Sequence, residues 1–171
     1  MKKTLLPLCL ALSLATPALS VQAAPSQAEI DQAVKVLKQA ANQGLVTRYS
    51  LSELAQIVKA EGYSSVTTKG DNKVTFKSDG HLFSLYLYDD GDLQIYFGAQ
   101  GVKVTADDIN TWNKEHRLSR AYLDNDGDIA LEADLFANGG LNEKMVSALL
   151  SIFVNTSVPA FIDFAKEHDK S

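Results

Sequence analysis

The chain has 171 residues, of which 46% are hydrophobic and 22% charged, and its formal net charge is −5. This length favours one compact domain with a substantial core. The composition is that of a folded globular protein rather than of a disordered or collagen-like one, and the acidic charge argues against a nucleic-acid-binding protein.

The first residues have the three-part pattern of a secretory signal peptide. Lys2 and Lys3 form a short positive region, an apolar run extends from Leu5 to about Leu19, and Val21–Ala23 provides a cleavage site. The apolar run is short and contains two prolines, which argues against a membrane anchor. We therefore expect a signal peptide at residues 1–23, a single mature domain at residues 24–171, and export to the periplasm.

Processing at this site would also remove the only cysteine, Cys9, and two lysines. Leu8, rather than a small residue, precedes Cys9, which argues against lipid attachment. The remaining 14 basic and 21 acidic residues give a net charge of −7, so we expect no nucleic-acid partner and no attraction to anionic lipid. Without a cysteine, the mature chain can form no disulfide.

Two helices are predicted at the start of the mature chain. Residues 28–42 carry apolar side chains at the spacing of one helical face: Ile30, Val34, Leu37 and Ala41. Ser50 and Glu53 have the spacing of a capping box, which predicts a second helix that Gly62 ends.

Residues 66–97 change to a period of two. β-Branched and aromatic residues alternate with polar ones, and Asp-Gly turns interrupt them, which is typical of an antiparallel meander. We expect three strands here. In this pattern Phe83, Leu85 and Leu87 face the core, whereas Tyr86 and Tyr88 lie on the other face.

The last part of the mature chain predicts a helix, two strands and a final helix. Thr105 is a candidate cap for the first of these helices, and Asn142 lies where the final helix begins, with Leu141 and Val146 spaced to close over its entry. Pro159 is expected to kink or restart that final helix. The predicted fold is α+β, a five-stranded antiparallel meander-plus-hairpin sheet packed by helices in the order α-α-β-β-β-α-β-β-α.

The acidic run Asp124–Asp128 resembles a calcium loop but lacks its ligand pattern. If Gly127 takes the glycine position of an EF-hand, Tyr122 and Ala133 take the first and last ligand positions, and neither is a ligand. Asp, Asn and Gly are also the residues of tight turns. We interpret the run as a hairpin turn and predict no metal or cofactor, with a weak, opportunistic Ca²⁺ site as the alternative.

No catalytic constellation is visible in the sequence. His81, His116 and His168 lie far apart, and there is no G-x-S-x-G motif. Glu132 and Asp134 lie on the same side of one predicted strand, where two acids are more often a solvated face than a hydrolase pair. We therefore predict that the protein is not an enzyme.

The stretch INTWNKEHRLSRAYLDNDGDIALEADLFANGGLNEKMVSALLSIF, residues 109–153, resembles the YbjN family, described as bacterial sensory transduction regulators. Leu131, Phe153 and ten further residues carry the resemblance. Those ten are also the candidate interaction residues: Trp112, Asn113, Arg117, Tyr122, Asp126, Gly127, Glu132, Asp134, Gly139 and Gly140. The family is similar in fold to the small chaperones of type III secretion, which pair as dimers and bind extended protein segments. The resemblance therefore implies a protein partner and a homodimer, and it implies no catalytic residue.

Some of these residues also have a structural interpretation. Trp112 is expected in the core, with a recognition surface as the alternative, and Asn113 is expected to bond nearby backbone. Arg117 is a candidate partner of Glu132 or Asp134, or a ligand contact.

We expect an exported regulatory or chaperone-like domain that binds protein through Tyr86, Tyr88 and Tyr96 or through its last helix. The alternative is a small-ligand sensor with a pocket between the sheet and the last helix. Close packing of Phe161 and Phe164 over the sheet would argue against that pocket.

Overall fold

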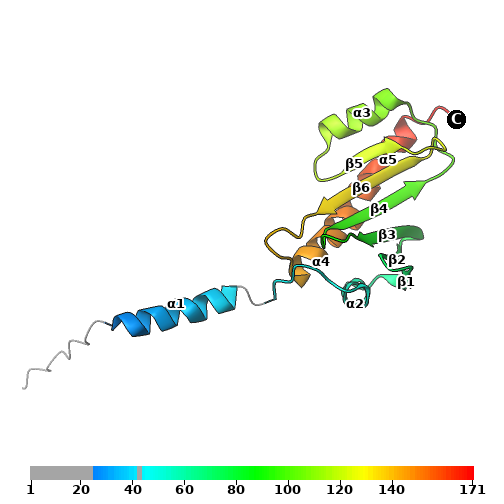
Figure 1. Ribbon diagram of the computed structural model, residues 1–171. Coiled ribbons are helices and arrows are strands. Elements are labelled where there is room, and N and C mark those ends of the chain that lie inside the picture. Colours follow the sequence, from blue (N-terminus) through cyan, green and yellow to red (C-terminus); the bar gives the residue numbers. More distant parts are fainter. Residues whose placement is uncertain (1–24, 42–43) are drawn as a thin grey trace, which may run out of the picture. The chain divides into compact units, whose positions relative to one another are not determined.

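Figure 1 shows the computed structural model of the chain, which describes residues 25–41 and 44–171. The chain divides into two compact units, one ending at Ala41 and one beginning at Asn42. The predicted signal peptide, residues 1–23 with Cys9, lies outside the described residues. Its cleavage, and the start of the mature domain at residue 24, stay predictions.

The first unit contains helix α1 (Gln27–Ala41), close to the range that the apolar spacing predicts. Ile30, Val34 and Leu37 are exposed on this helix. Glu29 accepts a hydrogen bond of 2.7 Å from the backbone N–H of Ser26, which satisfies a donor near the helix start.

The second unit is an α+β structure of helices and an antiparallel sheet. Its elements are α2 (Leu51–Ala60), β1 (Ser64–Lys69), β2 (Lys73–Ser78), β3 (His81–Leu87), β4 (Leu93–Ala99), α3 (Ala106–Glu115), β5 (Arg120–Leu123), β6 (Ile129–Leu135), α4 (Glu143–Ile152), a π-helix (Phe153–Ser157) and α5 (Val158–Glu167). The fold class is confirmed, but the predicted count of five strands is wrong, because the sheet has six.

The additional strand arises between residues 81 and 99, which form β3 and β4 rather than one strand. The chain reverses at Tyr88–Asp92, where the N–H of Tyr88 donates to the carbonyl oxygen of Asp92 at 2.9 Å. Gly91 has a φ of +92°, a left-handed conformation that glycine adopts at little steric cost. The Asp-Asp-Gly run is therefore a complete hairpin turn.

The strands lie in the order β1-β2-β3-β4-β6-β5, and every neighbouring pair is antiparallel. Side chains alternate between the two faces, so that Leu93, Ile95 and Phe97 of β4 are buried while Gln94 and Tyr96 point the other way. In Figure 1, α4 and α5 run behind the sheet. No helix among the described residues of this unit covers the face turned to the viewer.

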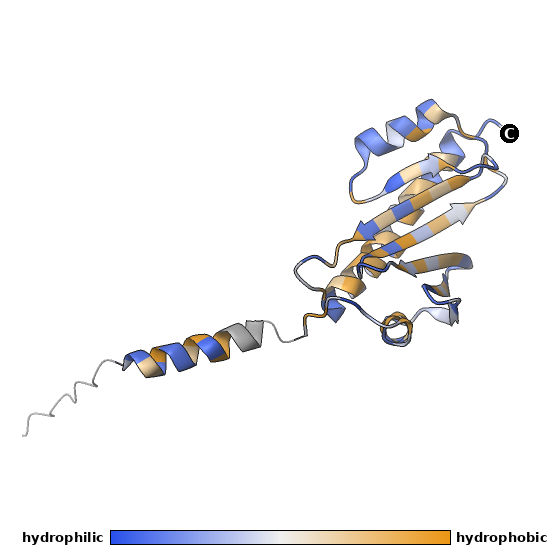
Figure 2. Cartoon of the chain, in the orientation of Figure 1, coloured by the Kyte–Doolittle hydropathy of each residue, from blue (hydrophilic) through white to orange (hydrophobic). Residues whose placement is uncertain are grey.

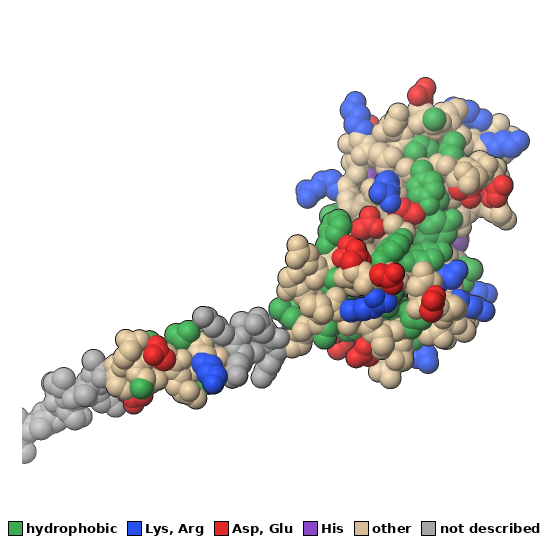
Figure 3. All heavy atoms as spheres, in the orientation of Figure 1, with side chains coloured by type: hydrophobic (Ala, Val, Ile, Leu, Met, Phe, Trp, Pro, Cys, Tyr) green, Lys and Arg blue, Asp and Glu red, His purple; other side chains and the backbone are tan. Residues whose placement is uncertain are grey.

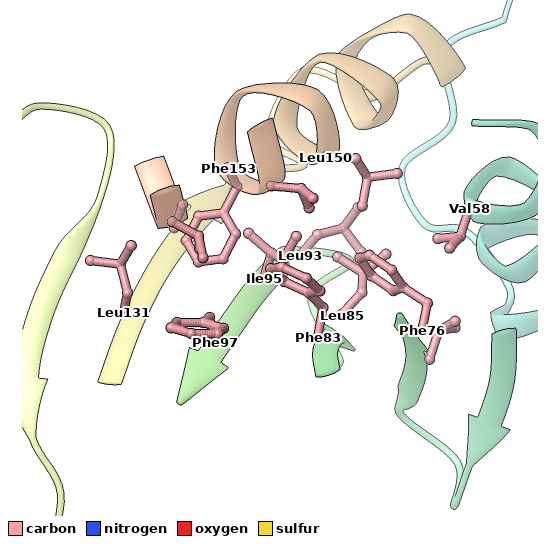
Figure 4. Packing of buried hydrophobic residues seen from close by; sticks show 14 of the residues in the cluster. Val58, Phe76, Phe83, Leu85, Leu93, Ile95, Phe97, Leu131, Leu150 and Phe153 are labelled. Carbon is pink, nitrogen blue, oxygen red and sulfur yellow. The ribbon is translucent and has the colours of Figure 1, made fainter. Parts of the chain in front are cut away.

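The core lies between the sheet and the long helix, as Figure 4 shows. Phe76, Phe83 and Phe97 come from three neighbouring strands, with ring centroids 5.3 and 5.7 Å apart, and Phe153 meets Phe83 edge-on at 6.4 Å. Each of these side chains is at most 2% exposed. Burial of one such ring stabilises the fold by about 1.5–3 kcal/mol.

The helix starts agree with their predicted caps. Ser50 with Glu53 and Thr105 with Asp108 both form capping boxes, and the side chain of Asn142 accepts the N–H of Met145 at 3.0 Å. These bonds satisfy backbone donors that a helix start otherwise leaves free.

Pro159 was predicted to kink or restart the final helix, and the structure places it at the start of a separate α-helix, α5. The chain stays helical over the 25 residues Glu143–Glu167. A π-helix precedes the proline, and in it the N–H of Val158 bonds the carbonyl oxygen of Phe153. Pro159 then lies in the first turn of α5, where its missing N–H costs least.

The turn between β3 and β4 packs closely against two other segments. A Cβ atom on Gly91 would lie 2.1 Å from the carbonyl oxygen of Thr47 and 3.3 Å from the Cβ atom of Ala137. The carboxylate of Asp92 accepts the N–H of Ala137 at 2.6 Å. Glycine at residue 91 is therefore required both by backbone conformation and by space.

Gly91→Ala should lower the free energy of unfolding by about 2–4 kcal/mol, because it adds a backbone clash to the cost of a positive φ. Gly101→Ala is the matched control, since Gly101 has a φ of +79° and open space around it. The control should cost only about 1 kcal/mol. Urea unfolding measures both values, and equal losses would contradict the close packing at Gly91.

Candidate functional site

The face of the sheet that the helices leave uncovered is the candidate site. Figure 3 shows hydrophobic side chains gathered in a band across it, with charged side chains beside the band. We call it the open face, made of the outward residues of five strands: Lys73, Thr75, Ser84, Tyr86, Gln94, Tyr96, Gly98, Arg120, Tyr122, Ala130, Glu132 and Asp134. Tyr88 lies just beyond the end of β3 and bonds to Gln94 at 3.0 Å.

Glu132 is the centre of a hydrogen-bond network on the open face. The hydroxyl of Tyr122 donates to its Oε1 at 2.5 Å, and Nη2 of Arg120 donates to its Oε2 at 2.5 Å. Nε2 of Gln94 lies 3.4 Å from the same Oε2 and donates to Asp134 at 2.8 Å. The side chains of three strands are therefore joined through one carboxylate.

The burial of Glu132 corrects the sequence prediction that this residue points into solvent. It does point away from the helices, but its neighbours on the sheet leave it only 7% exposed. Tyr96 and Arg120 lie directly opposite it on the two adjacent strands. A buried carboxylate needs such partners, because removing its water without replacing the hydrogen bonds is costly.

The two donors to Glu132 hold their protons firmly. Burial, together with the hydrogen bond to Glu132, raises the pKa of Tyr122. The same carboxylate raises the pKa of Arg120. At neutral pH both groups are therefore donors, and both oxygens of Glu132 are engaged as acceptors. This arrangement supports a structural role for Glu132 over the hydrolase hypothesis for Glu132 and Asp134.

The tyrosines of the open face are held by their neighbours. A Cβ atom on Gly98 would lie 2.5 Å from the hydroxyl of Tyr96, so the absence of a side chain at Gly98 leaves room for the Tyr96 ring along the sheet. Nζ of Lys73 lies 5.3 Å from the ring centroid of Tyr86, within the range of a cation–π contact. The band is therefore preorganised, with little rotamer freedom left to lose on binding.

The tryptophan of the family motif, Trp112, lies in the core, which is the position predicted from the sequence. Trp112 is 1% exposed, stacks on His116 at 3.6 Å, and meets Phe161 at 5.0 Å and Phe164 at 5.5 Å. It joins α3 to α5 and is not available as a recognition surface.

Asn113 bonds the backbone of the edge strand β5, as predicted. Its Nδ2 donates to the carbonyl oxygen of Ala121 at 2.9 Å, and its Oδ1 accepts the N–H of Ala121 at 2.8 Å. The amide thus pairs with the strand as another strand would. Asn113 stabilises the strand that carries Arg120 and Tyr122.

The prediction that Arg117 pairs with Glu132 or Asp134 is wrong. Arg120 is the arginine that pairs with these two carboxylates. Arg117 is exposed in the loop before β5, whereas Arg120 lies opposite Glu132 in the strand and 4.0 Å from Asp134. Arg120 and Gln94 also belong to the site, although no sequence motif predicts them. The signal for both was their place on the same face as Tyr122 and Glu132.

The acidic run Asp124–Asp128 forms a hairpin turn, as the sequence predicts. The carboxylate of Asp124 accepts the N–H groups of Asp126 and Asp128 at 3.0 and 2.9 Å, and Gly127 has a φ of +82°. Asp124 is therefore engaged with its own backbone.

The Gly139-Gly140 pair also forms a turn, with φ values of +91° and +93°. The N–H of Gly140 donates to the carbonyl oxygen of Ala137 at 2.8 Å. Of the candidate residues, the structure thus brings together Tyr122, Glu132 and Asp134 on the open face. Trp112, Asn113, Gly127, Gly139 and Gly140 support the fold, whereas Arg117 and Asp126 are exposed in loops.

The region between the sheet and the long helix is closely packed around Phe161, which is fully buried. A hollow of about 200 Å³ lies beyond it, lined in part by His81, Phe83, Val158 and Ile162. Pockets for drug-sized ligands occupy about 300–1,000 Å³. This packing argues against the small-ligand hypothesis.

Asn113→Ala should destabilise the fold by about 1–3 kcal/mol, because it leaves the N–H and carbonyl groups of Ala121 without their partner. Asn110→Ala on the exposed side of the same helix is the control and should change stability by no more than about 0.5 kcal/mol. Chemical denaturation tests the pair. A loss at Asn113 no larger than at Asn110 would show that the amide does not support β5.

Tyr122 should make stability fall at alkaline pH. Its pKa is raised by folding, so the unfolded chain loses this proton first, at about pH 10. The contribution is complete below that pH and is lost as the pH rises through the folded pKa. Between pH 9 and pH 11 the wild type should lose about 1 kcal/mol more than Tyr122→Phe in urea unfolding. Identical losses would exclude the shift.

Comparison with curated protein sequences finds no match. Among solved structures, the type III secretion chaperone SycH of Yersinia pestis, in complex with a stable fragment of YscM2, is similar over 64% of this chain and 98% of that chain. The sequence identity is 17% and the TM-score 0.49. Proteins this far apart need not share a partner or an activity.

The model of the YbjN family, described as "Putative bacterial sensory transduction regulator", matches residues 50–164. The match begins at the cap of α2 and ends within α5. It includes the whole sheet, with the Glu132 network and Asn113. The chain therefore belongs to the YbjN family, as the resemblance predicted.

Proposed function

We propose that this protein is an exported, non-enzymatic regulatory or chaperone-like domain that binds another protein through its open face. The observation that carries the proposal is the uncovered sheet face with preorganised tyrosines around the Glu132 network. Membership in a family of sensory transduction regulators is consistent with such a role.

The chemistry of the open face fits a protein partner. Tyrosine is enriched at protein interfaces because it combines a large apolar ring with a hydroxyl. Tyr86, Tyr88 and Tyr96 supply such rings, and Arg120 and Asp134 supply charges that remain partly exposed. A broad face of this kind makes many contacts with another protein but encloses little of a small molecule.

The proposed location is the periplasm. The positive, apolar and small-residue pattern of residues 1–23 supports export. An acidic charge of −7, from 14 basic and 21 acidic residues after processing, agrees with a protein rather than a nucleic-acid partner.

Co-purification from the periplasm tests this function. Tagged protein, expressed from the full-length sequence, should recover a specific protein partner, and Tyr86→Ser with Tyr96→Ser should reduce that recovery by about tenfold or more, since each lost aromatic anchor costs about 1–2 kcal/mol.

Leu118→Ser is the control, because Leu118 is 66% exposed and lies outside the open face. It should recover the partner as the wild type does. Circular dichroism must show that all variants are folded. Equal recovery by the double variant and the wild type would reject the open face as the binding surface.

A further inference from the structure

A hollow of about 650 Å³ lies between helix α2 and the start of α4. This volume is within the range of pockets that hold small ligands. None of its lining residues belongs to the open face or to the smaller hollow near Phe161. Its lining combines apolar and polar side chains, among them Val46, Tyr49, Glu53, Ile57, Glu143 and Lys144.

Ordered backbone holds the two sides of this hollow together. The N–H of Val46 donates to the carbonyl oxygen of Leu141 at 2.7 Å, and the N–H of Leu141 donates to the carbonyl oxygen of Val46 at 2.8 Å. These two residues lie shortly before Ser50 and Asn142, the caps of α2 and α4. Beyond its first residues α4 is largely hydrophobic, as Figure 2 shows, and its buried side fixes it in the core. The hollow is therefore a fixed feature of the fold.

Tyr49 is a buried residue with an unpaired hydroxyl that faces this hollow. Its side chain is 8% exposed and packs in the core. Burial raises the pKa of Tyr49, the carboxylates of Glu143 and Glu53 raise it further, and no hydrogen bond from the described residues acts on it. Both carboxylates line the hollow, so the hydroxyl lies on their side. A buried tyrosine usually has a hydrogen-bond partner for its hydroxyl, and here a ligand can supply one.

The two carboxylates leave the hollow with a negative charge. Oε2 of Glu53 accepts the N–H and the hydroxyl of Ser50, both at 2.7 Å, which leaves Oε1 available. These bonds hold the pKa of Glu53 below its usual value, so it is ionised at neutral pH. Neither Glu53 nor Glu143 forms an ion pair within the described part of the chain, although Lys144 is close in sequence. Two carboxylates and one ammonium group give the lining a charge of −1.

We propose that this hollow binds a small organic cation, an ammonium group attached to an apolar body. The ammonium group donates to Glu143, to the available oxygen of Glu53 and to the hydroxyl oxygen of Tyr49, and the tyrosine ring offers a cation–π contact. The apolar body covers the side chains of Val46 and Ile57. A metal ion fits less well, because it needs several oxygen ligands at once, and the described residues hold no group of three metal-ligating side chains.

The cation site goes beyond the proposed function and does not depend on it. It shares no residue with the open face, and it differs from the pocket between the sheet and the last helix that the small-ligand hypothesis requires. A ligand in this hollow contacts both α2 and α4 and so links the two helix starts. Loss of the cation site and loss of partner binding at the open face are therefore separate experimental outcomes.

An NMR titration of the protein, expressed from the full-length sequence, with phenethylammonium chloride tests the site. The backbone signals of Tyr49, Gln56 and Lys144 should shift, with a dissociation constant in the millimolar range, because ion pairs that are open to water gain little. Phenylethanol and phenylpropionate, which have a similar apolar body but are neutral and anionic, are the matched controls. Each should bind at least about tenfold more weakly, since neither offers an ammonium group to the carboxylates.

Charge variants of the lining should change the affinity in opposite directions. Glu143→Gln and Glu53→Gln should each weaken phenethylammonium binding by about two- to fivefold, the range of a partly exposed ion pair. Glutamine at residue 53 preserves the capping box. Lys144→Gln should tighten binding by about twofold, because it removes a like charge. Glu115→Gln, at an exposed position on α3, should bind as the wild type does. Circular dichroism must show that all variants are folded.

Several results would overturn the proposal. Phenethylammonium that shifts no signal of the hollow, or that binds no better than phenylethanol, would show that the hollow does not select a cation. Weaker binding in Lys144→Gln would show that the hollow attracts a negative group instead. A lysine blocked at both ends carries the same ammonium group in the form that a protein presents. If it binds more tightly than phenethylammonium, the hollow accepts a side chain of a protein, and the proposal of a free small ligand is wrong.

Discussion

Phe83 lies at the centre of the molecule, between Phe76 and Phe97 on neighbouring strands and beneath Phe153 of the long helix. This packing buries one face of the sheet under a single layer of helices. A sheet covered on one side only must present an opposite face that tolerates water, since alternate residues of each strand point there. The composition of the open face follows from that constraint. Its tyrosines, glutamine and charged residues alternate with the phenylalanines and leucines of the core.

Glu132 shows how a polar residue is accommodated on such a face. Its neighbours exclude most of the water from its carboxylate, which therefore needs hydrogen-bond donors from the protein. Tyr122 and Arg120 provide them from the adjacent strand. These bonds fix the donors as well as the acceptor. The network therefore turns a set of surface side chains into a defined arrangement, which lowers the entropy that a partner must overcome on binding.

Sequence patterns predicted the features that depend on neighbouring residues. The caps at Ser50, Thr105 and Asn142 and the turn at Asp124–Asp128 each involve residues only a few positions apart, so their spacing was sufficient. The Tyr88–Asp92 turn carried the same chemistry, but it was not counted as a strand boundary. Features that depend on residues far apart in the chain were harder to predict from the sequence. The pairing of Arg120 rather than Arg117 with Glu132 requires the register of β5 on β6, which the hydrophobic pattern does not give. The burial of Glu132 likewise depends on three strands at once.

The two edges of the sheet indicate that partners meet its faces. An edge strand with free N–H and carbonyl groups can pair with another chain. At β5, Asn113 occupies the backbone groups of Ala121 and so blocks the middle of the edge. At β1, the register shifts between Ser64 and Thr67, and Ser65 has a φ of +54°, so the strand is bent by a bulge. Such irregularities discourage pairing at an edge. With both edges of the sheet protected, the open face remains as a surface of this sheet on which another protein can bind.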